Sequence, residues 1–283
     1  MFLVKSLFIV IYVIVSILGD CKQCTQHKHY DELNCKPIKD KPDDCCPSRY
    51  ECKDFTSLDR TKCHLKGKVY DLGMEISTNL PTCTKSCECD GAEDEHGFSC
   101  KFDECPEAKS LPNPNCAYQF TIDSCCSINS VCDPKEIEKL PRCWMDGHEF
   151  VKGNLIYSPS APCFKCLCDE KFNNATDLSQ NSNCKPVDCG IELHQLSYLQ
   201  LGCAPVYFDD GLCCPFEFRC PTAKDAIIET SKKTVQSEHT CRYGNLTLNV
   251  GEAIKTDEPC LECFCKIPPM VHCVRTITTE KCH

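Results

Sequence analysis

The sequence has few of the residues that fill a large hydrophobic core. Hydrophobic residues make up 42% of the 283 residues, but this figure includes 32 cysteines, which leaves about 31% for other apolar types. Such a small apolar share excludes one large packed core, and small units of this composition need covalent links to be stable.

Long apolar runs are missing after the first twenty residues. The run from Leu7 to Leu18 is almost unbroken, with Lys5 before it and Gly19 after it. This pattern is typical of a secretory signal peptide, and the run is too short to span a membrane. We therefore expect residues 1–19 to be a signal peptide and the protein to be secreted, extracellular and without a membrane span. A buried helix is the alternative for this run.

Basic residues are also scarce, with 31 Lys and Arg against 41 Asp and Glu and a formal net charge of −10. Loss of Lys5 with the signal peptide brings the mature chain near −11. This acidity argues against nucleic acid or heparin as the main partner. The chain has no metalloprotease, hydrolase, nucleotide-binding or calcium-loop motif. We therefore expect a protein that is not an enzyme, with no catalytic residues, no cofactor and no metal.

The cysteines are abundant, and their spacing repeats. A triplet C-x-x-C-x-C occurs at Cys163, Cys166 and Cys168 and at Cys260, Cys263 and Cys265, with a longer variant at Cys83, Cys87 and Cys89. A single cysteine precedes each triplet, and two glycines and an isoleucine lie between this cysteine and the triplet. The three sets are Cys63, Gly67, Gly73 and Ile76; Cys143, Gly147, Gly153 and Ile156; and Cys241, Gly244, Gly251 and Ile254.

A second group of cysteines, which we call the back half, includes an adjacent pair of cysteines. It follows the first two of these front halves. Its copies are Cys100, Cys105, Cys116, Cys125, Cys126 and Cys132; Cys184, Cys189, Cys203, Cys213, Cys214 and Cys220; and, alone at the N-terminus, Cys21, Cys24, Cys35, Cys45, Cys46 and Cys52. The C-terminus has only a front half, which ends with Cys273 and Cys282. All cysteines thus fit one ten-cysteine template. It predicts a partial unit at 20–52, complete units at 63–132 (unit 1) and 143–220 (unit 2), a linker at 221–240 and a partial unit at 241–283.

This pattern, with Tyr70 and Phe150 between the glycines, resembles the von Willebrand factor type C module, also called the chordin-like cysteine-rich repeat. Family members usually have an aromatic residue where this chain has its isoleucines. The resemblance implies these pairs in the complete units: Cys63–Cys89, Cys83–Cys125, Cys87–Cys100, Cys105–Cys126 and Cys116–Cys132, then Cys143–Cys168, Cys163–Cys213, Cys166–Cys184, Cys189–Cys214 and Cys203–Cys220. In the partial units it implies Cys24–Cys46, Cys35–Cys52, Cys241–Cys265 and Cys263–Cys273.

Four cysteines of the partial units then remain. Closing a short loop costs less entropy than joining the chain ends. We therefore predict Cys21–Cys45 and Cys260–Cys282. A cross-terminal bond or an intermolecular bond that makes a dimer is the alternative.

The expected fold is a small, disulfide-rich, mainly β and irregular structure with tandem modules arranged as beads on a string. Short runs such as Lys68–Asp71 and Glu149–Lys152, set off by glycines, predict small antiparallel strands. The back halves predict irregular loops with at most a short hairpin. The cysteine-free linker 221–240 is expected to attach the last unit most loosely. Lys232–Lys233 within it is either a processing site or two solvated lysines.

Several side chains suggest modification or metal binding. Asn174 and Asn245 are N-glycosylation acceptors. Zinc binding by the triplets is the alternative to disulfides, but export favours oxidation. His27 with His29 could bind a metal weakly, and Asp90–Glu95 could attract a cation. We expect solvated loops in both places.

Function has to be inferred as binding. The resemblance implies recognition of an extracellular protein ligand, a growth factor of the bone morphogenetic protein or transforming growth factor beta class or a matrix protein. Ile76, Ile156 and Tyr157 are the candidate contact residues, and packing of the isoleucines inside their own units is the alternative. A structural or defence component is the second hypothesis for the whole protein, and a protease inhibitor is the third.

Overall fold

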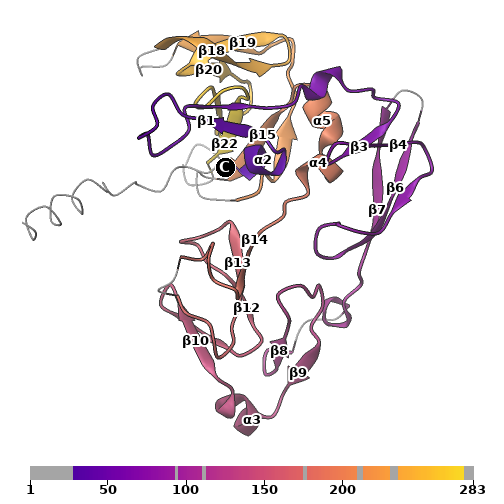
Figure 1. The fold of residues 1–283 in the computed structure, drawn as a ribbon, viewed down its shortest axis with the longest axis vertical. Coiled ribbons are helices and arrows are strands. Elements are labelled where there is room, and N and C mark those ends of the chain that lie inside the picture. Colours follow the sequence, from indigo (N-terminus) through magenta and orange to yellow (C-terminus); the bar gives the residue numbers. More distant parts are fainter. Residues whose placement is uncertain are drawn as a thin grey trace, which may run out of the picture.

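The computed structural model describes residues 28–92, 95–109, 113–174, 177–208, 213–229 and 235–276. Short strands, short helices and irregular segments alternate along the chain (Figure 1). Thirteen disulfides join described cysteines, so the expectation of a small, disulfide-rich, mainly β and irregular fold is confirmed. No helix within these residues is long and apolar enough to cross a membrane. The predicted signal peptide 1–19 and Lys232–Lys233 lie outside the described residues.

Each front half begins with an antiparallel hairpin. The three copies are β3 (Cys63–Leu65) with β4 (Lys68–Tyr70), β10 (Arg142–Met145) with β11 (His148–Val151), and β18 (Val235–Tyr243) with β19 (Leu246–Val250). The first turn has φ of 48° at Lys66 and 77° at Gly67. Two positive φ values match the right-handed twist of a two-residue hairpin, which explains the glycine. The predicted strands at Lys68–Asp71 and Glu149–Lys152 are therefore present within one residue.

Three antiparallel strands that are neighbours in one sheet follow each hairpin. The copies are β5 (Glu75–Ile76), β6 (Thr84–Ala92) and β7 (Glu95–Phe102); β12 (Leu155–Tyr157), β13 (Phe164–Leu167) and β14 (Cys184–Pro186); and β20 (Glu252–Lys255), β21 (Leu261–Phe264) and β22 (His272–Arg275). The last two strands place cysteines directly opposite each other, as in Cys87 and Cys100, whose Cα atoms are 4.0 Å apart. The strand register thus accounts for this disulfide in all three copies.

The back halves contain one more hairpin each. The copies are β1 (Lys36–Ile38) with β2 (Arg49–Glu51), β8 (Ala117–Gln119) with β9 (Asn129–Val131), and β15 (Ala204–Phe208) with β16 (Glu217–Arg219). Each hairpin starts directly after one cysteine and ends directly before its partner, as with Cys116 and Cys132. The disulfide therefore closes the open end of the hairpin. The short hairpin agrees with the prediction for these halves, but the prediction of nothing beyond a hairpin is wrong, because they also contain short helices.

Short helices lie in the two spacers and in each of the three back halves. They are α2 (Lys28–Glu32), α3 (Pro134–Lys139), α4 (Ile191–His194) and α5 (Leu196–Gln200), with 3-10 turns η1 (Phe55–Ser57) and η2 (Pro106–Ala108). The helix α3 begins where the Asp133 side chain accepts a hydrogen bond from the Lys135 N–H, with Pro134 at its first position. Both features favour a helix start.

The linker prediction for 221–240 is wrong in its structural part. Within it, β17 (Ala226–Glu229) pairs with β20, and β18 begins at Val235. A six-stranded sheet runs in the order β16-β15-β22-β21-β20-β17, and β15 and β22 are parallel neighbours. The C-terminal half unit is therefore joined to unit 2 by a continuous sheet.

Two core clusters gather three predicted beads into one body. One contains Val206 of unit 2 with Leu248 and Ile254 of the C-terminal half. The other contains Tyr30 and Phe55 near the N-terminus, with Ile191, Leu196 and Leu199 of unit 2. We call these parts the body: the N-terminal half unit, the back half of unit 2 and the C-terminal half unit. The beads-on-a-string arrangement does not describe them, because side chains distant in sequence bury one another.

The rest of the chain is more extended. We call the back half of unit 1 with the front half of unit 2 (β8–β14 and α3) the arm, which forms the lower part of the view in Figure 1. Its main cluster, around Cys143, Ile156 and Cys166, lies within unit 2 alone. The front half of unit 1 packs against the body through Leu65 and Leu193.

Candidate functional site

The disulfides determine which segments lie next to one another in any site on this chain. The thirteen pairs between described cysteines are the same pairs that the sequence resemblance implies for them. Cys45, Cys46 and Cys260 are also disulfide-bonded. Their expected partners, Cys21, Cys24 and Cys282, lie outside the described residues. Those three pairings stay predictions.

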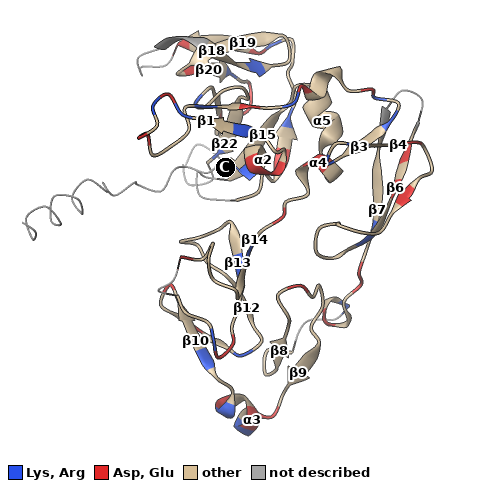
Figure 2. Cartoon of the chain, viewed as in Figure 1, with Lys and Arg blue, Asp and Glu red and all other residues tan. Residues whose placement is uncertain are grey.

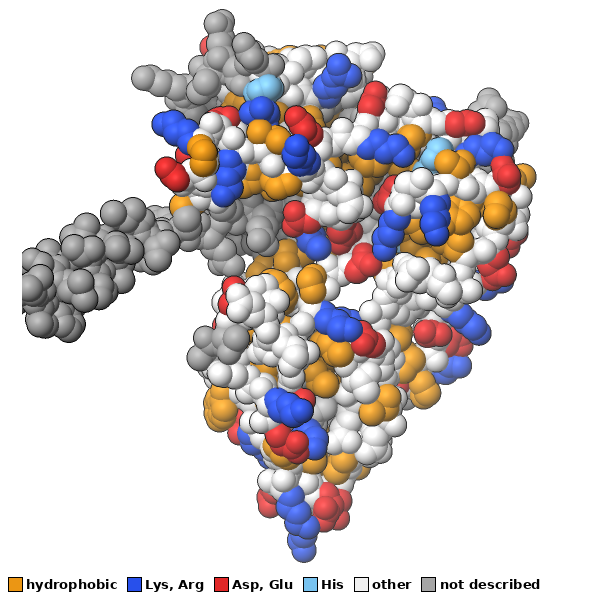
Figure 3. Space-filling view, in the orientation of Figure 1, with side chains coloured by type: hydrophobic (Ala, Val, Ile, Leu, Met, Phe, Trp, Pro, Cys, Tyr) orange, Lys and Arg blue, Asp and Glu red, His pale blue; other side chains and the backbone are white. Residues whose placement is uncertain are grey.

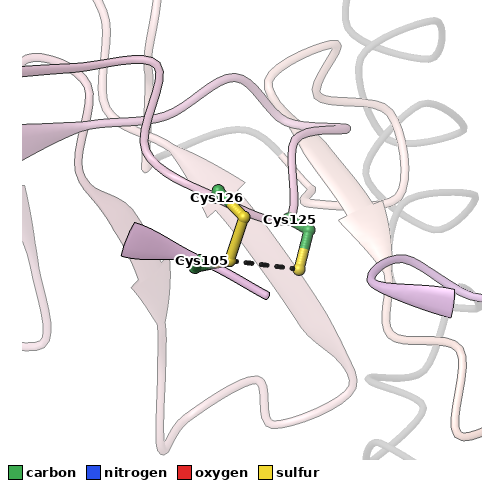
Figure 4. A group of neighbouring side chains, drawn as sticks. All are labelled: Cys105, Cys125 and Cys126. Atoms are coloured by element: carbon green, nitrogen blue, oxygen red, sulfur yellow. Dashed lines mark hydrogen bonds between the residues drawn. A yellow bond between two sulfur atoms is a disulfide. The ribbon is translucent and has the colours of Figure 1, made fainter. Parts of the chain in front are cut away.

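Sulfur atoms crowd together where the adjacent cysteine pair meets the front half. Cys105 is bonded to Cys126, and its Sγ lies 3.6 Å from the Sγ of Cys125 (Figure 4). Cys125 is bonded to Cys83, so neither sulfur of this contact carries a proton, and the contact is van der Waals. Cys189, Cys213 and Cys214 repeat the cluster in unit 2. Metal binding requires thiolates, so these oxidised clusters are covalent junctions between front and back halves.

The three predicted contact residues differ in exposure. The Ile156 side chain is 1% exposed and packs against the cysteines of its own unit. It cannot contact a partner, so it is wrong as a binding residue, and the packing alternative holds for it. Ile76 is half-buried and packs in the corresponding cluster of unit 1. Tyr157 is 62% exposed.

Tyr157 borders an open groove of about 560 Å³ at the junction of the two complete units. Because side chains alternate along a strand, Leu155 and Tyr157 lie on the face of β12 opposite Ile156. The groove is lined mainly by aromatic and apolar side chains from both units: Tyr118, Phe120, Phe150, Leu155 and Tyr157. Aromatic side chains that are partly exposed are typical anchors of protein–protein contacts. The groove is our candidate functional site.

Contacts between the two units fix the shape of the groove. The Phe120 N–H donates to the Gly153 carbonyl, with an N···O distance of 2.8 Å. The Asn154 Nδ2 donates to the Tyr118 carbonyl at 3.1 Å. Gly153 has φ of 92°, and a Cβ there would lie 2.7 Å from the Gln119 Cβ. Glycine is thus required both by the backbone and by the close approach of the preceding unit.

A lysine stands beside the groove. Lys165 on β13 lies opposite Tyr157, and its Nζ is 3.0 Å from Thr82 Oγ1. Burial lowers the pKa of Lys165 below its usual range. Asp123 and Asp188 act electrostatically on this ammonium, but among the described residues no carboxylate forms an ion pair with it. A ligand that brings an apolar side chain to the groove and a carboxylate beside it would therefore be complementary.

A second hollow, a cleft of about 500 Å³, lies where α2, β3 and α4 meet. In Figure 3, acidic and basic side chains gather at the hollow in the middle of the face shown. Figure 2 shows both charges on α2 and an acidic residue on α4. Glu32 accepts hydrogen bonds from the N–H groups of Cys189 (2.5 Å) and Ile191 (3.2 Å), and Glu192 accepts one from Lys66 N–H (2.6 Å). Burial raises the pKa of Glu32, while these N–H groups act against the rise. The two carboxylates therefore join segments that are distant in sequence: Glu32 joins α2 to the start of α4, and Glu192 joins α4 to the β3–β4 turn.

Both glycosylation acceptors lie on the surface. Asn245 is exposed in the β18–β19 turn. Asn174 is exposed, and its Nδ2 donates to the Trp144 carbonyl at 2.9 Å. Exposure meets the steric need for a glycan, and modification of both residues stays a prediction. Of the other suggested metal sites, His29 is buried, with Nδ1 2.6 Å from the Tyr207 hydroxyl, and is not the solvated residue that the sequence predicts.

No family model matches the chain, no curated protein matches its sequence, and no solved structure matches its fold. The assignment of the site therefore depends on the sequence and the geometry alone.

The sequence prediction found one groove residue and missed the others. Tyr118 and Phe120 follow Cys116 in a back half, where no strand was expected to face a partner. Phe150 was noted only as a spacing residue. The available signal was the position of these aromatic residues: Tyr118 and Phe120 lie two and four positions after Cys116, and Phe150 lies seven positions after Cys143. These positions indicate a shared site only once the two units are known to touch.

Proposed function

We propose that this chain is a secreted protein that binds an extracellular protein ligand. In its finer form the proposal names a growth factor of the bone morphogenetic protein or transforming growth factor beta class, whose access to its receptor the protein modulates. The observation that carries the proposal is the aromatic groove at the junction of units 1 and 2, with Tyr157 62% exposed at its border. The choice of growth factor depends on the resemblance of the cysteine pattern to the type C module.

The groove has the properties of a binding surface. Its walls come from two units joined by hydrogen bonds and by the ion pair of Asp123 with Lys185. Ordering the groove on binding therefore costs little entropy. Large aromatic side chains provide contact area with few rotatable bonds. Lys165 supplies a cation at the edge. The proposal assigns no catalytic role to any residue.

Binding of growth factors of this class to the immobilised full-length protein tests the proposal. Replacement of Tyr157 by alanine should weaken binding about tenfold or more, as expected of an exposed aromatic anchor. Trp144→Ala is the matched control, because Trp144 is 55% exposed on the same unit and does not line the groove.

Absence of binding by a protein with all cysteines oxidised would reject the growth-factor form and favour the structural or defence role. If both variants lose binding affinity equally, the groove is not the binding site, although the proposal that the protein binds a ligand is not affected.

A further inference from the structure

Gly73 and Gly153 occupy the same position in the two complete units, ten residues after the first cysteine. The back-half hairpin of unit 1 covers Gly153, where Phe120 N–H donates to the Gly153 carbonyl and Gln119 fills the space beside the Cα. At Gly73 nothing lies within 4 Å of the corresponding point. No described residue donates a hydrogen bond to the Gly73 carbonyl. One front half is covered by the preceding hairpin, and the other is open.

The open surface is apolar. Val69, Leu72 and Met74 surround Gly73 in the sequence and are 58%, 58% and 47% exposed. In unit 2 the positions at the same distances from the first cysteine hold Glu149, Lys152 and Asn154. We call Val69, Leu72, Gly73 and Met74 the Gly73 surface. An exposed apolar surface of this kind, where the repeat has polar residues, indicates a protein contact.

The N-terminal hairpin has the edge that would fit this surface. Lys39 follows β1 as Phe120 follows β8, four residues after Cys35 and Cys116 respectively. Among the described residues, β1 pairs with β2 alone, and the Lys39 N–H has no acceptor. The hairpin precedes unit 1 in the chain but packs elsewhere, with Tyr50 N–H donating to Pro268 O at 2.9 Å. Figure 1 shows β1 and the strands β3–β7 on opposite sides of α4 and α5.

Charges repeat in the same way. At the covered junction, Asp123 and Lys185 form an ion pair of 2.5 Å. Asp123 lies two residues before Cys125 and Lys185 one residue after Cys184. The same places in the N-terminal half unit and in unit 1 hold Asp43 and Lys101, which are exposed and form no ion pair with any described residue.

The junction of unit 2 with the C-terminal half unit has different residues at these positions. Unit 2 and the C-terminal half meet through the parallel strands β15 and β22. The positions that correspond to Asp123 and Lys185 hold Gly211 and Val274 there. The junction that is built from parallel strands therefore lacks the opposite charges found at the covered junction.

We propose that the Gly73 surface of one chain binds the β1 edge of a second copy, in the arrangement that β8 and unit 2 show within one chain. Lys39 N–H donates to the Gly73 carbonyl, Asp43 pairs with Lys101, and Pro37 and Ile38 cover Met74. Because the two surfaces are different, the contact is heterologous and produces rings or open chains of copies. This association is independent of the proposed ligand and leaves the Tyr157 groove open.

Sedimentation equilibrium of the full secreted protein, up to a concentration of about 1 mM, tests the proposal. Association should rise with concentration. Asp43→Lys or Lys101→Asp should each weaken it about tenfold or more, because like charges then face each other. The double reversal should restore the wild-type association. Met74→Asp should weaken it without affecting the charge pair.

Lys135→Asp and Glu138→Lys on α3 are matched controls, since they change the charge equally at exposed positions of the arm. Complete cysteine oxidation in every variant shows that folding is intact. A monomer at every concentration would overturn the proposal, whether the surface stays open, accepts the chain's own hairpin or binds another protein. Association that survives both single reversals, or that the double reversal fails to restore, would overturn it equally.

Discussion

The body and the arm are built from the same repeat but are held together by different forces. In the body, Arg219 is 7% exposed, and its guanidinium contacts Asp225 (2.7 Å), Glu258 (2.8 Å) and the Tyr243 hydroxyl. In the arm, the two units meet through two hydrogen bonds and an ion pair whose side chains are 46% and 69% exposed. The difference shows that cysteines define each unit, whereas buried side chains decide which units become one body.

Removal of the buried carboxylate should have the largest effect. Asp225→Ala removes the carboxylate that Arg219 contacts through two nitrogens, and breaking a buried ion pair of this kind typically costs about 3–5 kcal/mol. Hydrogen exchange of β20–β22 should therefore accelerate strongly, while exchange of β12–β14 in the arm should not change. Equal acceleration in both regions would show that body and arm unfold together, which contradicts the distinction between them.

Loss of one long disulfide should cost nearly as much and act on the unit 1 fold. The Cys83–Cys125 bridge has a sequence separation of 42 residues, against 10 for Cys263–Cys273. The chain-entropy estimate gives about 4 kcal/mol for the first and about 3 kcal/mol for the second. Urea unfolding of the two double cysteine-to-alanine variants should show the larger loss for Cys83 and Cys125. The opposite order would show that the sheet of the body, not loop length, controls disulfide stabilisation.

Acid should weaken the body through Asp225. Burial opposes ionisation of Asp225, but the hydrogen bonds from Arg219 and Thr222 outweigh it and lower the pKa of Asp225 below 3.8. Its stabilising contribution is therefore present above pH 3.8 and disappears as the pH falls through the folded-state pKa. Unfolding free energies measured between pH 6 and pH 2 should fall more steeply for wild type than for Asp225→Ala. Identical slopes would contradict this role.

The exposed ion pair of the arm should matter least. Asp123→Ala removes the partner of Lys185, and exposed pairs of this kind contribute about 0–1 kcal/mol. The same Asp-to-Ala change thus has a small effect in the arm and a large one in the body. Hydrogen exchange of β8 and β12 provides the measurement, and a loss comparable to that of Asp225→Ala would remove the distinction between the regions.

Local structure was predictable from the sequence because it depends on neighbouring residues. The turn at Lys66 and Gly67 needs positive φ, and Cys87 and Cys100 face each other once the strands on either side of them pair. Such features recur in each unit and can be recognised by spacing alone. The burial of Ile156 against its own cysteines is of the same kind.

The assembly of the body was not predictable because its contacts join residues far apart in sequence. The Tyr30 hydroxyl donates to the Ile267 carbonyl at 2.7 Å, across 237 positions. The strand β17 reads as a short apolar run inside a polar spacer, and nothing nearby identifies β20 as its partner. Tyr157 could be chosen from its spacing, but the aromatic residues that accompany it come from the preceding unit.

Cleavage between β17 and β18 would test most directly whether the C-terminal half unit is an integral part of the body. A protease site placed between Glu229 and Val235 allows the folded protein to be cut without touching a described strand or disulfide. We predict that the two fragments stay together on native size exclusion and separate in denaturant without reductant. The β15–β22 pairing and the Arg219 contacts join them, no disulfide between described cysteines crosses the cut, and the predicted Cys260–Cys282 pair lies within the C-terminal fragment. Release of the C-terminal fragment under native conditions would contradict the account and restore the picture of a loosely attached bead.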